Sequence, residues 1–211
     1  HTRTRRQRQM CIRDSVRGYC KLQLEFCPQM SDIKKYPTLV WLDLEMTGLD
    51  PDSERIIEIA SAVTSHDLSE VIEGPNLVIK QPAEFIDNMD EWNTNQHTKS
   101  GLVDSLKVTN VSVEQAEHKT LEFLSRHTES GRSPLCGNSI SHDRRFLRRY
   151  MPKLDAFFHY RNVDVSSIKE LLKRWNPELL EGFKKRGGHR AMEDVLESIE
   201  ELKFYRDNFF I

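Results

Sequence analysis

The amino-acid sequence predicts an α/β fold, built on a mixed central sheet with helices on both faces. Three short apolar, β-rich segments follow one another closely between residues 38 and 80. Segments with strand-like and helix-like patterns then alternate up to residue 208. Closely spaced strands are typical of an antiparallel meander, and alternation of strands with helices is typical of a sheet covered by helices. We see no internal repeat and no second domain, so we expect residues 31–211 to form a single domain.

The first three predicted strands are apolar runs separated by turn residues. They span Thr38–Leu44, Ile56–Thr64 and Asn76–Lys80. Gly48 and Pro51 mark a turn after the first strand, and a Gly-Pro pair precedes the third. Because the connections are short, we expect these strands to pair as an antiparallel meander.

The rest of the chain is predicted from helical spacing of apolar residues, short buried strands, and prolines that end helices. The predicted elements are, in order, short helices over Pro82–Trp92 and Asn95–Ser105, a helix over Ser112–Arg126, a strand over Pro134–Asn138, a helix over Ser141–Tyr150 that ends at Pro152, a strand over Tyr160–Val165, a helix over Ser166–Trp175, and a long helix over His189–Asn208.

The composition is that of a globular protein in a reducing compartment. The 211 residues are 37% hydrophobic and 30% charged. No stretch approaches the roughly 20 apolar residues that span a bilayer, so we expect no membrane partner. The four cysteines show no CxxC spacing, which argues against a zinc site and a disulfide framework. We expect the cytoplasm.

Charge is distributed unevenly along the chain. Residues 1–37 carry a net charge of +6, and residues 38–211 carry −8. Proteins that track along long nucleic acids usually present a basic face. The acidic body therefore indicates that any nucleic-acid substrate is short.

Residues 1–30 are expected to lie outside the fold, because they show no sustained periodicity. The run from Gln7 to Ser15 resembles translated sequencing-adaptor peptides, which indicates that residues 1 to about 15 are an assembly artefact. A natural start at Met30 would give a compact chain. A natural disordered extension, a mitochondrial transit peptide and a basic arm that touches nucleic acid are the alternatives.

Two carboxylates stand close together at the end of the first predicted strand. Asp43 and Glu45 are two residues apart, so their side chains point to the same face, while Leu44 points to the other. A second D-x-E, at Asp52 and Glu54, lies in a turn and is read as solvated surface. Ligands in α/β proteins bind at strand ends, which favours a functional role for the first pair.

Three further residues stand at predicted helix starts. Asp143 lies in the first turn of its helix, and Asp194 lies near the start of the last helix. Either acid could simply complement the helix dipole. His189 and Asp194 are five residues apart, about 140° around a regular helix, and converge only if His189 lies in the turn before that helix.

The sequence resembles the histidine subtype of the DEDD 3′-to-5′ exonucleases. The resemblance lies in the types, order and spacing of five residues, Asp43-x-Glu45, Asp143 and His189-x4-Asp194. The resemblance is closest to the members that degrade very short RNAs to mononucleotides. It is carried by six strings: WLDLEMTGLDP (41–51), RIIEIA (55–60), DEWN (90–93), CGNSISHDRRFLRRYMP (136–152), HYRNVDVSSIKEL (159–171) and HRAMEDVLESIEEL (189–202). It implies a ribonuclease H-like fold and a homodimer.

The chemistry that the resemblance implies suits these residue types. Four neighbouring carboxylates could not all stay ionised without a cation, and hard oxygen ligands favour Mg²⁺ or Mn²⁺. Two such ions about 4 Å apart can clamp a scissile phosphate. The implied ligands are Asp43, Glu45, Asp143 and Asp194. His189 has an intrinsic pKa near neutrality and suits the general base.

The resemblance also implies how a short substrate is held. Leu49 and Trp92 match residues that hold the bases, and His97 matches one near the base end. The residues that match the cap on the 5′-phosphate are Ser139, Arg161, Ser166 and, from the neighbouring subunit, Tyr160. Such a cap accommodates a substrate of two nucleotides, whereas a longer RNA loses the contacts with the cap.

We therefore expect a metal-dependent 3′-to-5′ exoribonuclease that acts on dinucleotides and other short oligoribonucleotides. The alternatives are a proofreading or tRNA-trimming exonuclease of the same superfamily, and an inactive RNA-binding module of the same fold. A cluster of arginines at positions 144, 145, 148 and 149 is expected to be a solvated or dimer-facing surface rather than an RNA contact.

Overall fold

Five strands pair into one mixed sheet. Their order is β3 (Val71–Val78), β2 (Ile56–Thr64), β1 (Leu39–Met46), β4 (Leu135–Gly137) and β5 (Asn162–Asp164). The first three pair antiparallel, and β4 and β5 continue the sheet in parallel from β1. The predicted meander is therefore confirmed, and so is the mixed sheet. The central position of β1 is what brings residues from distant parts of the chain to its carboxyl end.

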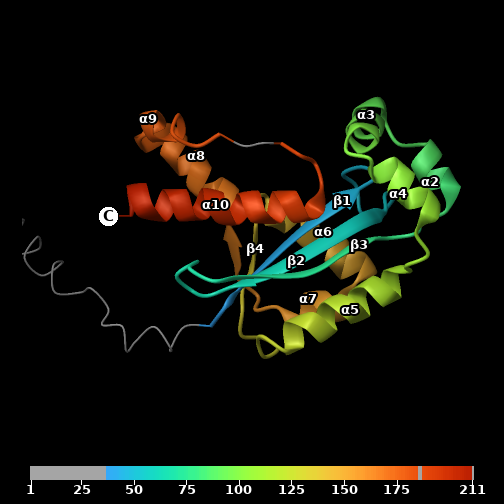
Figure 1. The fold of residues 1–211 in the computed structure, drawn as a ribbon, viewed down its shortest axis with the longest axis horizontal. Coiled ribbons are helices and arrows are strands. Elements are labelled where there is room, and N and C mark those ends of the chain that lie inside the picture. The colour runs from blue at the N-terminus through green and yellow to red at the C-terminus, as the bar shows by residue number, and fades with distance from the viewer. Residues whose placement is uncertain (1–36, 185–186, 211) are drawn as a thin grey trace, which may run out of the picture. The chain divides into compact units, whose positions relative to one another are not determined.

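Helices cover both faces of the sheet, as predicted. They are α2 (Ala83–Asp87), α3 (Glu91–Lys99), α4 (Leu102–Val108), α5 (Val113–Ser125), α6 (Ile140–Tyr150), α7 (Pro152–Phe157), α8 (Val165–Trp175), α9 (Pro177–Leu180) and α10 (Ala191–Phe209). Figure 1 shows α8 and α10 on one side of the strands, α5 and α7 on the other, and α2, α3 and α4 gathered at one end.

The alternation of side chains along β1 separates two cores. Val40, Leu42 and Leu44 belong to the larger apolar cluster, which packs against α5, α6 and α7. Trp41 points the opposite way, into the cluster formed with α8 and α10. Asp43 and Glu45 have the same parity as Trp41, so they lie on the α10 side of the sheet. One strand thus supplies core residues to one face and carboxylates to the other.

Several predicted elements are confirmed with small shifts at their ends. The second strand has the predicted bounds, and α5 lies within Ser112–Arg126. Ser112 is the N-cap of α5, and its side chain forms a reciprocal capping box with Gln115. The prediction of this helix rests on the helical spacing of its apolar residues, and that spacing is confirmed.

The helix boundaries between residues 82 and 108 were predicted wrongly. Two helices were expected, and the structure has three. Asp90 caps α3 by accepting a hydrogen bond from the Asn93 N–H, so a helix starts where continuation was expected. Gly101 adopts a φ of 73°, which ends the local helical path and begins α4.

Two prolines were also misread. Pro75 was taken as a residue before the third strand, yet β3 runs through it, because an edge strand tolerates a missing N–H. Pro152 was taken only as a helix end, but it occupies the first turn of α7, where its fixed φ suits a helix start. Helices α7 and α9 were not predicted.

The computed structural model describes residues 37–184 and 187–210. The predictions for residues 1–30 fall outside these ranges. Within them, no helix has both the length and the apolar character needed to cross a membrane.

Candidate active site

Three carboxylates converge where β1 meets the start of α10. Oxygen atoms of Asp43, Glu45 and Asp194 all lie within 4.8 Å of one another. The two β1 residues share a face because they are two apart, and α10 packs across that face. Asp194 stands in the first turn of α10, where its N–H donates to the Arg190 carbonyl at 3.0 Å. The group is therefore assembled by a strand and a helix about 150 residues apart in sequence.

Asp143 lies beside this group rather than within it. It is in the first turn of α6 and is 6% exposed. Its Oδ1 accepts a hydrogen bond of 3.0 Å from the backbone N–H of Leu44, between the two β1 carboxylates. The resemblance predicts four metal ligands, and the structure gathers three closely, with the fourth next to them.

Burial and mutual repulsion strongly perturb these acids. The pKa of Asp43 is raised well above its usual range, first by burial and then by the neighbouring charges of Asp143, Glu45 and Asp194. Burial, followed by the charges of Asp194 and Glu58, raises the pKa of Glu45 to about 8. Burial also raises the pKa of Asp143 to about 7, despite the Leu44 hydrogen bond. A set of hard oxygen donors whose charges repel in this way fits a divalent cation.

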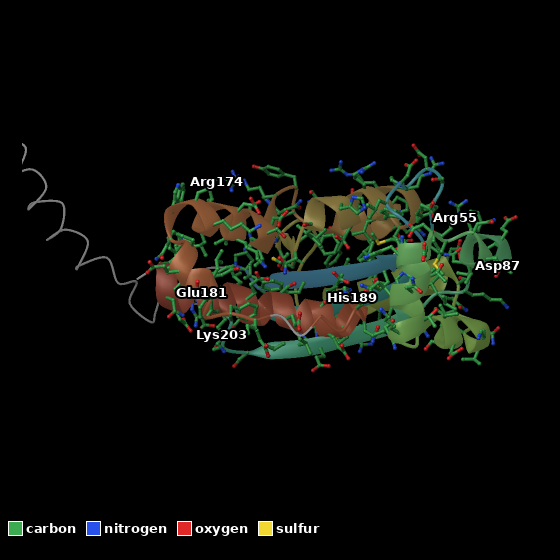
Figure 2. The ribbon with its side chains drawn as sticks, turned by 90° about the horizontal axis from the view of Figure 1, so that it is seen from above. Arg55, Asp87, Arg174, Glu181, His189 and Lys203 are labelled. Carbon is green, nitrogen blue, oxygen red and sulfur yellow. The ribbon has the colours of Figure 1, made fainter. Side chains whose placement is uncertain are left out.

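His189 lies in the turn that precedes α10, not in the helix. Its φ is 50°, and α10 begins two residues later at Ala191. The predicted start of the helix at His189 was therefore wrong. The condition for convergence with Asp194 was that His189 lies in the turn before the helix, and this condition is met. Helix α3 contacts this turn: Gln96 Nε2 lies 3.4 Å from His189 Nε2, and the Trp92 ring meets the His189 ring edge-on at 6.2 Å. Figure 2 shows His189 at the end of α10 nearest α3.

The residues expected to hold bases differ sharply in exposure. Leu49 and Trp92 are 72% and 62% exposed, so both present apolar surface to solvent. His97 is only 2% exposed. Its Nε2 lies 3.0 Å from the Met46 carbonyl oxygen, and its Nδ1 lies 3.8 Å from Glu45 Oε2. His97 thus ties α3 to the end of β1, and burial lowers its pKa.

Two of the expected cap residues meet, although they are 27 positions apart. The Ser139 N–H donates to Ser166 Oγ at 2.9 Å and to Asp164 Oδ1 at 3.1 Å. Ser139 has a φ of 52°, a conformation that turns the chain from β4 into α6. Behind the pair, Ser166 Oγ donates to Asn138 Oδ1 at 3.0 Å.

The other two cap residues lie next to each other before β5. Tyr160 is 73% exposed, and the Arg161 guanidinium lies 5.2 Å from the centre of its ring. Across residues 37–184 and 187–210, no hydrogen bond, ion pair or ring contact joins either residue to the acidic group. Arg144 supports this segment by donating to the carbonyl oxygens of His159 and Tyr160 at 3.1 and 3.3 Å. Arg144 is 7% exposed, so the expectation of a solvated or dimer-facing surface is wrong for that arginine.

Some residues at the site were not singled out from sequence. Gln96 contacts His189, and Asn138 supports the two cap serines. Glu58 and Arg190 form an ion pair beside the acidic group, with Oε1 and Nη2 2.6 Å apart. The available signal was a lone acid within the apolar run IIEIA, since a charge buried in a strand requires a partner.

Comparison with known proteins agrees with this geometry. The RNase T family model, described as an exonuclease, matches residues 40–202. The oligoribonuclease of Marinobacter nauticus is 58% identical over 172 residues, which are 82% of this chain and 96% of that protein. The oligoribonuclease of Bordetella pertussis is 56% identical over 170 residues, covering 81% and 94%.

Solved structures show the same fold at low identity. The Mg²⁺- and Mn²⁺-bound form of Pop2p from S. pombe aligns with a TM-score of 0.61 and 17% identity, covering 90% of this chain and 91% of that one. Exonuclease I from E. coli, in its zinc-bound complex with single-stranded DNA, also gives 0.61, at 16% identity, over 82% of this chain and 41% of its own. The ribonuclease H-like fold is thereby confirmed. The chain belongs to the oligoribonuclease family, a branch of the DEDD superfamily of 3′-to-5′ exonucleases.

Proposed function

We propose that this 3′-to-5′ exoribonuclease hydrolyses dinucleotides and other very short oligoribonucleotides to mononucleotides, with two Mg²⁺ or Mn²⁺ ions and as a homodimer. The observation that carries the proposal is the group of half-buried carboxylates at the end of β1, with His189 in the turn that leads to one of them. Residues 31–211 would act as one exonuclease domain, and the cysteine usage described above favours the cytoplasm.

In the proposed mechanism, Asp43, Glu45, Asp143 and Asp194 hold the cations, directly or through water. Ions bound there would activate a water and stabilise the leaving 3′-oxygen. His189 accepts the proton of the attacking water. Imidazole is a common general base, and the position of His189 before α10 is compatible with reaching the space between α3 and the acidic group.

Base recognition is assigned to the exposed apolar residues near His189. Leu49 and Trp92 would enclose the two bases, since stacking on an aromatic ring is worth about 1–3 kcal/mol per base whatever the base is. His97 would act at the base end from its buried position, by holding α3 against Met46. Sequence-tolerant stacking suits an enzyme that must accept many short fragments.

Length selection is assigned to the cap on the 5′-phosphate. Ser139 and Ser166 already meet, and Arg161 supplies a guanidinium whose geometry suits a terminal phosphate. Tyr160 is the residue we assign to the neighbouring subunit's site, because its ring is 73% exposed and has no contact with its own acidic group among the described residues. The composite site makes the dimer necessary for cleavage of the shortest substrates.

The proposal is tested by offering a 5′-phosphorylated dinucleotide and a 20-nucleotide RNA side by side. We expect a strong preference for the dinucleotide in kcat/KM. Arg161→Ala should reduce dinucleotide cleavage about 10- to 100-fold, the loss of a charge-assisted contact of about 1.5–3 kcal/mol, and should affect RNAs of five to seven nucleotides far less. Equal losses at all lengths would reject the cap, and a preference for the 20-nucleotide RNA would favour a trimming exonuclease.

The composite site has its own test. Tyr160→Ala and Arg161→Ala subunits, each with a different affinity tag, are mixed and the heterodimer is purified. If Tyr160 reaches the partner's site, the heterodimer has one site with both defects absent and regains about half of wild-type activity on dinucleotides. Absence of rescue would place Tyr160 in its own subunit's site.

A further inference from the structure

We propose that Glu58 and Arg190 form a positioning pair that sets where His189 stands over the acidic group. This inference rests on the proposed role of His189 as the general base. The pair joins β2 to the turn before α10, and neither residue is among the proposed metal ligands or substrate contacts.

The carboxylate of Glu58 is fully buried and takes three donors. Arg190 Nη2 donates to Oε1 at 2.6 Å, and Arg190 Nε lies 3.1 Å from both oxygens. The backbone N–H of Ala191 donates to Oε2 at 3.1 Å. A buried charge is tolerated when it is paired and hydrogen-bonded, and this one is. Each contact holds the same short stretch of chain, residues 190 and 191.

Residues 190 and 191 lie in the chain between the proposed base and one of the proposed metal ligands. His189 directly precedes them, and Asp194 follows one helical turn later. The Ala191 N–H is one of the first donors of α10, which a helix cannot satisfy within itself. Arg190, the N-cap, makes no side-chain cap of its own. Glu58 therefore caps α10 from the neighbouring strand, with a negative charge at the positive end of the helix dipole.

The backbone of His189 needs such an anchor. Its φ of 50° is sparsely populated for residues other than glycine, and conformations of this kind persist where the surroundings determine them. Glu58 pairs directly across the ladder from Glu45. The ion pair of Glu58 and Arg190 thus fastens the turn that holds His189 to the strand position opposite Glu45, a proposed metal ligand. His189 and the carboxylates are therefore held by the same two strands.

Arg190 also reaches the helices on the other side of the turn. Its Nη1 lies 3.5 Å from the Ser100 carbonyl oxygen, at the C-cap of α3. Helix α3 carries Gln96 and Trp92, which contact His189. A planar guanidinium with several donors can bind the Glu58 carboxylate and this carbonyl together, which an ammonium group does less well.

A double-mutant cycle tests the proposal with the full chain. Arg190→Gln, His189→Ala and the double variant are compared with wild type on a 5′-phosphorylated dinucleotide in Mn²⁺. We expect Arg190→Gln to lower kcat about 10- to 100-fold with KM changed less than about threefold, since small misplacements of a base are costly. In the His189→Ala background the same change should lower kcat less than about twofold.

Arg190→Lys covers the case in which the glutamine variant fails to fold. It keeps a cation beside Glu58, so it should fold, and it should show the same dependence on His189 with a kcat loss of about 3- to 10-fold.

Glu117→Gln is the matched control. Glu117 is another buried carboxylate that caps a helix from a neighbouring element, since its Oε1 accepts from the Lys153 and Leu154 N–H groups at 2.8 and 3.0 Å. The Glu117→Gln variant should lower thermal stability, because it weakens this cap. It should leave kcat unchanged, because Glu117 lies on the opposite side of the sheet from α10. Any one of three results would overturn the proposal. The first is that Arg190→Gln lowers kcat equally with and without His189. The second is that Arg190→Gln leaves kcat unchanged, and the third is that Glu117→Gln lowers kcat as much as Arg190→Gln does.

Discussion

The two faces of strand β1 carry opposite kinds of side chain. On one face, Val40, Leu42 and Leu44 are buried among apolar side chains beneath α5, α6 and α7. On the other face, Asp43 and Glu45 stand beneath the start of α10 with raised pKa values. Consecutive residues of one strand therefore serve opposite purposes.

The difference shows how a protein can hold mutually repelling charges in place. The apolar face favours folding through burial, at roughly 25 cal/mol per Å² of apolar area. The acidic face opposes folding, because burial disfavours ionised carboxylates. Since both faces belong to the same backbone, the stability of one fixes the geometry of the other. The comparison predicts that substitutions on the two faces separate stability from activity.

The largest expected effect comes from the acidic face. Asp43→Ala should abolish turnover, with at least a 100-fold loss, because removing a cation ligand forfeits several kcal/mol of transition-state stabilisation. Without metal, its melting temperature should hold or rise, since one of several repelling charges is gone. Activity above about a tenth of wild type in Mg²⁺ would exclude Asp43 from the proposed role.

Asp143→Ala sharpens the same comparison. It should also abolish turnover, but it leaves the Leu44 N–H without its partner. An unsatisfied buried donor costs about 1–3 kcal/mol, so this variant should melt earlier than Asp43→Ala. Calorimetry on the metal-free proteins measures the difference, and identical melting temperatures would mean that the hydrogen bond contributes nothing.

On the apolar face the expected effects reverse. Leu42 is 1% exposed, and Leu42→Ala should lower the free energy of unfolding by about 2–5 kcal/mol through lost burial and a cavity. At a temperature where the variant stays folded, kcat on a dinucleotide should remain within about threefold of wild type. Urea unfolding and steady-state kinetics check both statements, and a kcat loss as large as that of Asp43→Ala would show that the faces are not separable.

A smaller effect is expected in the pH dependence of stability. The pKa values of Glu45 and Asp143 are raised to about 8 and about 7, so the folded state favours their protonated forms. Their contribution is fully present below their ordinary pKa values and is lost as the pH rises through the raised ones. In EDTA, the melting temperature should therefore fall between about pH 5 and pH 8.

Divalent metal should oppose that fall, because a ligand that binds only the folded state stabilises it, and it binds the ionised carboxylates. Leu42→Ala should keep the pH slope, since it leaves the acids in place, whereas Asp43→Ala should flatten it. A melting temperature that rises with pH in EDTA would contradict the assigned pKa shifts.

The comparison between faces was largely predictable from sequence. The two-residue spacing of Asp43 and Glu45 in an apolar run fixes their common face, and the helical spacing of apolar residues predicts α5. The sequence also stated the condition under which His189 converges with Asp194, namely that His189 lies in the turn before the last helix. Gly187 and Gly188 precede His189 and permit such a turn. These features depend on neighbouring residues, which is where sequence patterns are informative.

The supporting contacts were not predictable in the same way. Glu58 and Arg190 are 132 residues apart, and nothing local indicates that they pair. The burial of Arg144 and His97 likewise depends on segments that meet only in the folded chain. The misplaced ends of α2, α3 and α4 arose because Asp90 caps α3 with its side chain and Gly101 turns the chain with its backbone, and apolar spacing reveals neither.

The most direct test of the central claim is a crystal structure with Mn²⁺ and a dinucleotide bound to the His189→Ala variant, which we expect to turn over slowly, with the metal located by its anomalous scattering. The account predicts Mn²⁺ bound by Asp43, Glu45 and Asp194 on the α10 face of β1, with the scissile phosphate beside it and a base against Trp92. Mn²⁺ bound elsewhere, or a dinucleotide held away from that face, would contradict it.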